Sequence, residues 1–333
     1  MTKNDYGHTS GDEGIVLNES GFPIGRISFN GLGLRVRLLG YVGNKVSRGN
    51  GFAMGGIERW RTQVKAHHSQ SVAAQVDFDP GQDFWQGLAH KFRDDPFRLN
   101  DPLLVRLEEE FTDCNSLLDV GGGAGRFALP LALHREKVTV VDSSESMLNQ
   151  LKEASLESRI DNVEAIWSRW ERLPFNVLVH SGSLCSHVTY GIEDIETFVW
   201  NLNRFTADRV IVLAFMRSPQ AHLEVLWELT HGEKRINLPG VPELMGVLWE
   251  MGIIPELSIL ETLDPHIYES KIEAINDLRK RMYVNEGTEK DNDLISLLDV
   301  HLSPVKDGLE LLGSAGRTMC LVRWEPTELF RFL

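Results

Sequence analysis

The chain has 333 residues, 42% of them hydrophobic and 25% charged, which is the composition of a globular protein large enough for one domain with an appendage. Its formal net charge of −14 at pH 7 argues against nucleic acid as a partner, because phosphates repel an acidic surface. We expect no membrane span and no signal peptide, and the three widely spaced cysteines predict buried free thiols in a cytoplasmic protein.

Residues 1–80 differ from the rest in composition and periodicity. We expect them to form a glycine-rich, basic N-terminal extension of a main domain at 81–333. They lack sustained helical periodicity, and between 26 and 65 they carry eight basic side chains and one acidic one. Residues 26–29 and 34–38 alternate polar and apolar, as the strands of a β-hairpin would. A disordered extension is the alternative, because large apolar residues are few.

Two helices are expected before the first buried strand. Residues 84–92 have apolar side chains at helical spacing, so Trp85 and Phe92 either wall a substrate pocket or belong to the core. Asp101 followed by Pro102 is typical of an N-cap with proline at the first helical position, which predicts a helix leading into the strand.

The most informative segment comes next. An apolar run contains Asp119, and glycines then stand at alternate positions, Gly121, Gly123 and Gly125. Such a strand-to-helix turn brings bare backbone close to a ligand, because a side chain there would block the approach or forbid the dihedrals. The dinucleotide fingerprint Gly-x-Gly-x-x-Gly is not met, since its third position falls on Arg126 when read from Gly121.

A second apolar run, residues 138–141, ends in Asp142. Two buried parallel strands that each bring a carboxylate to the carboxyl edge of a sheet make a nucleoside site there. A carboxylate accepts hydrogen bonds from two vicinal hydroxyls well, and a thioether such as that of Met147 packs well against a purine face. The alternative is a purely structural glycine turn in an α/β protein.

The Asp-x-Gly-x-Gly-x-Gly segment resembles the first motif of class I S-adenosylmethionine-dependent methyltransferases, and residues 140–148 resemble their second motif. The resemblance covers roughly residues 83–326. It implies an α/β fold with a doubly wound, mostly parallel seven-stranded sheet of Rossmann-like type and an antiparallel last strand. It implies S-adenosyl-L-methionine as cofactor and S-adenosyl-L-homocysteine as product. The residues that it assigns to the cofactor are Asp119, Gly121, Gly122, Gly123 and Gly125 for the amino-acid part, Asp142 for the ribose, and Ser143 and Met147 for the adenine.

Strands and helices are then expected to alternate. We expect helices at 126–135, kinked at Pro130, and at 145–157, and strands at 163–167, within 177–185 and at 209–215. Later elements are helices at 218–231 and 242–251 and strands at 257–260 and 318–324. Helical insertions at about 218–252 and 266–300 are expected to shape the pocket for the methyl acceptor.

Members of the resembling family have no universal catalytic residue, because the methyl donor is already activated and the enzyme supplies proximity and alignment. The acid that often follows the third strand is replaced here by Arg169, and Trp170 either stacks on adenine or fills the core. Ser186 is expected beside the cofactor at the end of the fourth strand. His187 is either a proton acceptor or a structural histidine, and Tyr190 is expected to hold the substrate.

These residues predict a methyltransferase that acts by in-line displacement on a small-molecule acceptor at oxygen, nitrogen or carbon. The Asn/Asp-Pro-Pro-aromatic signature of nucleic-acid amino-methylating enzymes is absent from the sequence, and no histidines have metal-ligand spacing with an acid or cysteine. The alternatives are an RNA- or protein-modifying enzyme that uses the basic N-terminal arm, and a cofactor-binding protein without turnover.

Overall fold

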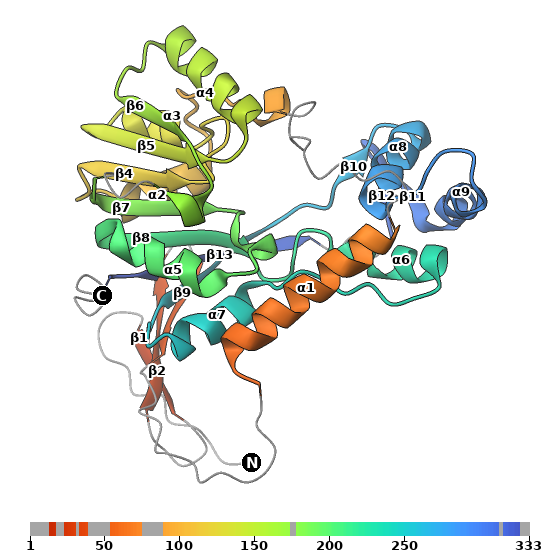
Figure 1. The fold of residues 1–333 in the computed structure, drawn as a ribbon, viewed down its shortest axis with the longest axis horizontal. Helices are drawn as coiled ribbons and strands as arrows, with labels where there is room; N and C mark the ends of the chain where they lie inside the picture. The colour runs from red at the N-terminus through yellow and green to blue at the C-terminus, as the bar shows by residue number, and fades with distance from the viewer. Residues whose placement is uncertain are drawn as a thin grey trace.

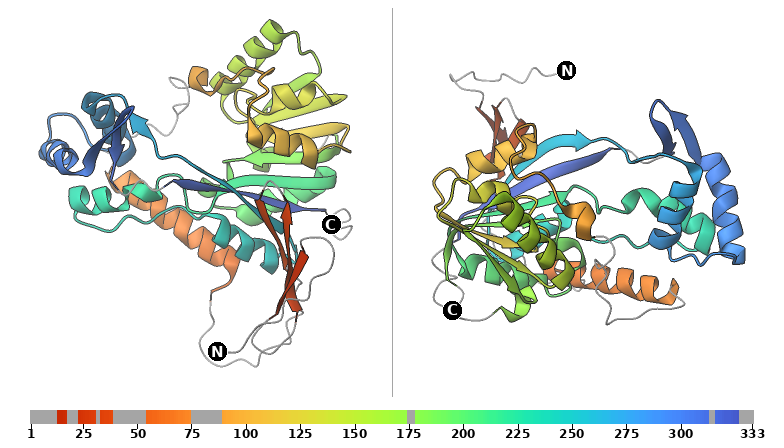
Figure 2. Two further views of the ribbon diagram at one scale, coloured as in Figure 1. Left: turned by 180° about the vertical axis from the view of Figure 1, so that it is seen from behind. Right: turned by 90° about the horizontal axis from the view of Figure 1, so that it is seen from above.

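A computed structural model describes residues 13–17, 23–30, 33–38, 54–74, 89–173, 178–312 and 316–326 of the chain. In Figure 1 a large twisted sheet with helices packed against it fills one part of the molecule, and a smaller unit of helices and short strands stands at one end. Figure 2 shows the same separation from behind and from above.

The large sheet contains the expected arrangement within a longer one. Among the described residues its strand order is β1-β2-β3-β9-β13-β8-β7-β4-β5-β6. Strands β4 to β8 run parallel, and β13 runs antiparallel to both of its neighbours. The strands of the expected part are β4 (Ser116–Val120), β5 (Lys137–Asp142), β6 (Val163–Trp167), β7 (His180–Ser186), β8 (Thr206–Phe215), β9 (Glu256–Leu263) and β13 (Arg317–Trp324). The predicted fold class is therefore confirmed.

The strand order reverses between β4 and β7, which creates the crevice where open α/β sheets bind ligands. Helices α3 (Ala128–Ala132) and α4 (Glu145–Ser158) connect β4 to β5 and β5 to β6, and α5 (Ile195–Arg204) connects β7 to β8. Because such crossovers are right-handed, the first two helices and α5 cover opposite faces of the sheet. With both faces covered, β4, β5 and β8 are nearly continuous runs of buried residues.

Two helices begin at the predicted residues, Pro102 and Glu145. Helix α2 (Pro102–Glu110) is capped by Asp101, whose Oδ1 accepts hydrogen bonds from Leu103 N and Leu104 N. Helix α4 is capped by Ser144 and buries four residues on its inner side. Those four are Met147, Leu148, Leu151 and Ala154, which lie at helical spacing.

The helix after the glycine turn is shorter than predicted. It covers five residues rather than 126–135, and Pro130 lies in its first turn. In a longer helix, the amide of residue 130 would donate to the carbonyl of Arg126. That oxygen instead accepts a hydrogen bond from Arg98 Nη2 at 2.9 Å. The predicted kink is therefore wrong, because the proline begins a short helix instead of bending a long one.

The N-terminal segment adds strands to the sheet. Strands β1 (Glu13–Leu17), β2 (Pro23–Asn30) and β3 (Gly33–Leu38) run antiparallel to one another, and β3 pairs with β9. The β2–β3 pair covers both segments where a hairpin was expected. The predicted domain boundary at residue 80 lies in 75–88, outside the described residues, and so does Trp85.

Helix α1 (Gly56–Ala74) forms where no helical periodicity was expected. It crosses α7 (Val241–Glu250) closely, because Gly56 has no side chain: a Cβ there would lie 2.5 Å from the carbonyl oxygen of Gly246. Trp60 is buried in the main core and donates from Nε1 to Ile192 O. The helix thus belongs to the layer that covers the large sheet.

The smaller unit at the end of the molecule has its own core. We call it the insertion subdomain and define it as α6 (Glu224–His231) with residues 266–312. Besides α6 it contains α8 (Lys271–Met282), α9 (Glu289–His301) and, among the described residues, a three-stranded sheet of β10 (Ile267–Tyr268), β11 (Leu302–Val305) and β12 (Gly308–Leu311). That small sheet was not predicted. The predicted helix at 218–231 is split into the 3₁₀ turn η4 (Ala221–Leu223) and α6, which ends at Gly232.

Within the described segments, no helix is both long and apolar enough to cross a membrane, and no three potential metal ligands gather. Cys114, Cys185 and Cys320 are all free and buried, as expected of their side chains.

Candidate functional site

The glycine turn after β4 forms the floor of the site. Gly121 has φ +69°, and a Cβ there would lie 2.3 Å from Val188 Cγ2. A Cβ on Gly122 would lie 2.5 Å from Asp119 Oδ2. Any larger residue would therefore collide with Val188 or Asp119, and at Gly121 it would also strain the backbone.

Asp119 is a buried carboxylate with an unusual environment. It is 3% exposed, and its Oδ1 has no hydrogen-bond partner in the part of the chain that the structure describes. Burial, and to a lesser degree the charge of Asp142, raises its pKa to about 7. An acid of this kind is costly to keep ionised unless a donor or a cation lies next to it.

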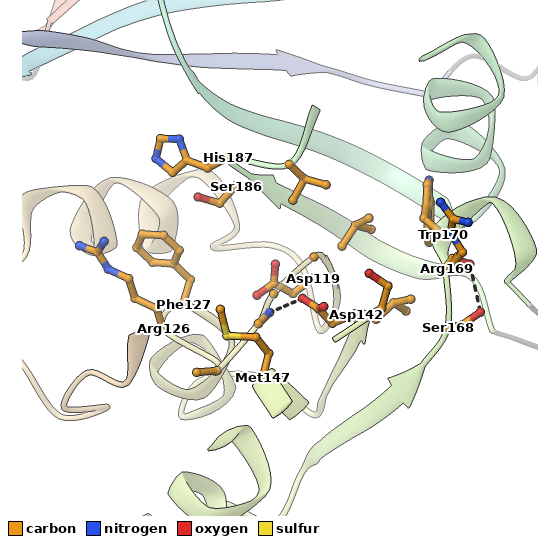
Figure 3. A pocket seen from close by; sticks show the side chains of 18 of the residues that line it. Asp119, Arg126, Phe127, Asp142, Met147, Ser168, Arg169, Trp170, Ser186 and His187 are labelled. Atoms are coloured by element: carbon orange, nitrogen blue, oxygen red, sulfur yellow. Dashed lines mark hydrogen bonds between the residues drawn. The ribbon is translucent and has the colours of Figure 1, made fainter. Parts of the chain in front are cut away.

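Asp142, at the end of β5, is held firmly by backbone amides. Gly123 N donates to its Oδ2 at 2.9 Å, and Ser144 N donates to its Oδ1 at 2.8 Å. The first of these bonds is drawn in Figure 3, where Asp119 and Asp142 lie side by side above Met147. Since a carboxylate oxygen accepts more than one hydrogen bond, both oxygens can also accept from a ligand.

A pocket of about 430 Å³ joins these groups at the carboxyl ends of β4, β5, β6 and β7. Eleven of the thirteen predicted site residues line it: Asp119, Gly121, Gly122, Gly123, Asp142, Ser143, Met147, Arg169, Trp170, Ser186 and His187. Phe92, of the 3₁₀ turn η1 (Ala89–Phe92), also lines it, as one of its two readings expected. The structure thus brings together residues that the chain spreads over more than sixty positions.

Gly125 and Tyr190 are the two predicted residues that do not belong to the described lining. A Cβ on Gly125 would lie 2.4 Å from Leu151 Cδ1, so this glycine serves the packing of the turn against α4. Tyr190, in the 3₁₀ turn η3 (Thr189–Gly191), is 5% exposed. It lies outside the described lining, and its expected contact with a substrate stays a prediction.

Trp170 forms a wall of the pocket and is also a core residue. It lies in the 3₁₀ turn η2 (Trp170–Arg172), donates from Nε1 to Phe198 O at 3.0 Å, and packs its ring edge-on against Phe205. Arg169 beside it is exposed. Trp170 can therefore both stack on adenine and fill the core, since one face of a residue can line a pocket while the rest packs inside.

His187 sits at the other side of the pocket, in a left-handed conformation with φ +60°. Its Nδ1 lies 3.0 Å from the hydroxyl of Tyr190, which itself accepts a hydrogen bond from Phe215 N at 2.7 Å. Part of the imidazole is open to the pocket, yet desolvation by the surrounding chain and the charges of Arg126 and Arg317 lower its pKa to about 4. The side chain is therefore neutral at pH 7.

Several lining residues were not anticipated from the sequence. Arg126 and Phe127 follow the glycine turn directly, and their side chains lie below His187 in Figure 3, with the guanidinium 5.2 Å from the phenyl ring. Their position after the turn was the available signal. Val188 and Ile192 come from the connection between β7 and α5, and Phe198 comes from α5 itself, which packs against the sheet. Neither helical insertion contributes to the described lining, contrary to expectation.

Comparisons with known proteins find a match for the segment that carries most of the pocket lining. Residues 117–208 match a family model described as a methyltransferase domain. The ribosomal RNA small subunit methyltransferase G of Clostridium perfringens (strain SM101 / Type A) is 42% identical over 65 residues, which is 19% of this chain and 27% of that protein. The match thus spans about a quarter of the length of that relative.

Solved structures are similar at lower identity. The YcgJ protein from Bacillus subtilis is 15% identical, with a TM-score of 0.49 over 68% of this chain and 100% of that one. A SAM dependent methyltransferase from Aquifex aeolicus is 15% identical, with a TM-score of 0.43 over 75% of this chain and 100% of that one.

The matched residues 117–208 contain the glycine turn, Asp119 and Asp142, and the strands that carry them follow the expected order. Residues 117–208 are therefore a methyltransferase domain, and their motifs are similar to those of class I S-adenosylmethionine-dependent methyltransferases.

Proposed function

We propose that this chain moves a methyl group from S-adenosyl-L-methionine to a small-molecule acceptor at oxygen, nitrogen or carbon. The observation that carries the proposal is the difference between two carboxylates in one pocket. Asp142 is fixed by two backbone amides, whereas Asp119 Oδ1 is buried without a donor among the described residues. A ligand that brings a cation to one carboxylate and hydroxyls to the other satisfies both.

The cofactor fits these residues. Its ammonium group is a donor for Asp119, and its ribose carries the vicinal hydroxyls that Asp142 can accept. The backbone of Gly121, Gly122 and Gly123 lines the pocket beside Asp119, where the amino-acid part would lie. When bound, S-adenosyl-L-methionine supplies a methyl group on a positively charged sulfonium and leaves as S-adenosyl-L-homocysteine.

The adenine is assigned to the far end of the pocket. Ser143 follows Asp142 there, and Met147 Sδ would lie 3.5 Å from a Cβ on Gly123. The buried Trp170 closes that end as an apolar wall, and the exposed Arg169 borders it. Soft and aromatic side chains of this kind favour a purine face.

On the acceptor side, His187 and Tyr190 are assigned to positioning. The Tyr190 hydroxyl accepts from Phe215 N, so its own proton is available to donate to His187 Nδ1. The neutral imidazole then carries its proton on Nε2 and presents it as a donor toward the pocket. With a pKa of about 4 it is a weak base, so its contribution is the alignment that an in-line displacement requires.

A small acceptor is supported by the limited size of the pocket, about 430 Å³, and by the net charge of −14. RNA is a second candidate, favoured by the partial likeness to a ribosomal RNA methyltransferase. It predicts RNA binding that weakens steeply with salt and disappears when residues 1–53 are removed. Binding that is absent, or that salt leaves unchanged, counts against it.

Isothermal titration with S-adenosyl-L-homocysteine tests cofactor binding. The variant Asp142→Ala should bind at least about tenfold more weakly, because two charge-assisted hydrogen bonds are lost. Asp208→Ala is the matched control, since Asp208 is an exposed acid in β8 that does not line the pocket. Equal affinity in all three proteins would refute the assignment.

Turnover is tested separately with S-adenosyl-[methyl-³H]methionine and a cell extract divided by size. Label in the small-molecule fraction supports the proposed acceptor class, and label in the RNA or protein fraction supports the second candidate. Binding without label in any fraction would leave a cofactor-binding protein that has no turnover.

A further inference from the structure

An arginine outside the described pocket lining faces the acceptor side of the site. Arg317 is the first residue of β13, at the carboxyl end of the neighbouring strand β8. Its guanidinium carbon lies 5.0 Å from the ring centroid of Phe215. The imidazole of His187 packs on the same phenyl ring, with centroids 4.6 Å apart. One ring therefore contacts both the pocket histidine and the arginine.

Arg317 differs from Arg281 and Arg323 in the acids that the described part of the chain offers it. Among the described residues no carboxylate lies within ion-pair distance of it, whereas Arg281 pairs with Asp277 and Arg323 with Glu256. Burial and the charge of Arg281 lower its pKa, but a guanidinium remains protonated in proteins. A half-buried cation without an anion is an energetic cost that a bound anion would remove.

Two other basic groups act on His187 or Arg317. Arg126 acts on His187, but it already pairs with Asp94 at 3.7 Å and with Asp101 at 3.9 Å. His222 adds no charge of its own, because burial together with Arg281 and Arg317 lowers its pKa to about 4 and keeps it neutral. Among the described residues, Arg317 is therefore the cation beside His187 that no acid neutralises.

We propose that Arg317 is a specificity-determining residue that binds an anionic oxygen group, a carboxylate or a phosphate, on the small-molecule acceptor. This group is not the atom that is methylated, so it stays on the product. The fork of a guanidinium matches both kinds of anion with two parallel hydrogen bonds. The neutral His187 then meets the part of the acceptor that receives the methyl group. The inference rests on the proposed methyl transfer and deepens it.

The variants for the test are Arg317→Met, Arg317→Lys and the control Arg172→Met, whose arginine is exposed and outside the pocket lining. Isothermal titration with S-adenosyl-L-homocysteine comes first. Equal affinity in all variants shows that the fold and the cofactor site are intact. Arg317→Met should not lower the melting temperature, because an unpaired buried charge is removed. If the wild type does not bind S-adenosyl-L-homocysteine, the proposed function itself is refuted, and not this inference alone.

Extract labelled by each variant is then passed over an anion exchanger. We expect the wild-type product to be retained, labelling to fall at least about tenfold in Arg317→Met, less in Arg317→Lys, and not in Arg172→Met. Phosphatase treatment separates the two sources: a phosphate product loses retention and a carboxylate product keeps it. A product that flows through the exchanger, or full labelling by Arg317→Met, would overturn the proposal.

If the extract contains no acceptor, acetate and inorganic phosphate serve as probes of the complex with S-adenosyl-L-homocysteine. At ionic strength matched with sodium chloride, one of them should raise the melting temperature of the wild type and of Arg172→Met but not of Arg317→Met. An equal response in all three proteins, or none, refutes an anion site at Arg317.

Discussion

The pKa of Asp119 makes cofactor binding depend on pH. In the free protein the carboxyl has a pKa of about 7, so it is protonated and neutral at lower pH. An adjacent ammonium favours the ionised form and lowers the pKa of the bound carboxyl below that range. Binding therefore requires the loss of a proton, and the dissociation constant must rise as the pH falls through 7.

The size of the effect follows from this value. The ionised fraction of Asp119 falls from about 0.9 at pH 8 to about 0.03 at pH 5.5. The dissociation constant for S-adenosyl-L-homocysteine should therefore rise about 30-fold, which is ~2 kcal/mol of binding free energy. His187 and His67 have pKa values of about 4 and stay neutral over this interval, so neither obscures the result.

Calorimetry at several pH values, in two buffers with different ionisation enthalpies, measures both the affinity and the protons released. At pH 6 the wild type should release close to one proton on binding. Asp119→Asn cannot ionise and should bind weakly with no pH dependence from pH 5.5 to 8. A flat wild-type affinity, or the same slope in Asp119→Asn, would refute the role given to this carboxylate.

Three further outcomes are expected. Asp142→Asn should weaken cofactor binding about tenfold, because only one of the two side-chain oxygens still accepts hydrogen bonds. The amide of Gly123 should then exchange its hydrogen faster, and an unchanged exchange rate would contradict the geometry. Tyr190→Phe should leave cofactor affinity unchanged but reduce methyl transfer, since His187 loses its partner, and lower stability by about 1–3 kcal/mol; an unaltered turnover number speaks against positioning. Gly56→Val should destabilise the protein by about 1–3 kcal/mol in urea unfolding, and an unchanged midpoint would mean that α1 and α7 do not cross as described.

The parallel strands and the cofactor end of the site could be predicted from the sequence. Buried parallel strands are continuous apolar runs, and a carboxylate at the end of such a run must lie at the carboxyl edge of the sheet. Asp119 and Asp142 could thus be assigned to one pocket without coordinates. The order of the strands came from the family resemblance, since no local pattern encodes it.

The remaining features depend on packing between distant segments. Helix α1 was missed because its buried face continues from Trp60 and Val64 into the polar His67 and Ser71, which bond to a distant loop instead of filling an apolar core. Tyr190 was expected to contact the substrate, but its hydroxyl already forms hydrogen bonds with Phe215 N and His187 Nδ1. Neither partner is recognisable from sequence spacing.

The insertion subdomain joins the sheet through two strands that are direct neighbours. Strand β9 ends at Leu263, β13 begins at Arg317, and these two residues are register partners in the antiparallel ladder. A tight turn could replace everything between them and leave the ladder whole, provided that polar residues take over from Leu226 and Trp227, which α6 buries against this unit. The segment between these two strands is thus exchangeable. It could be replaced or removed, in evolution or by design, while the part of the chain that carries the cofactor residues keeps its geometry.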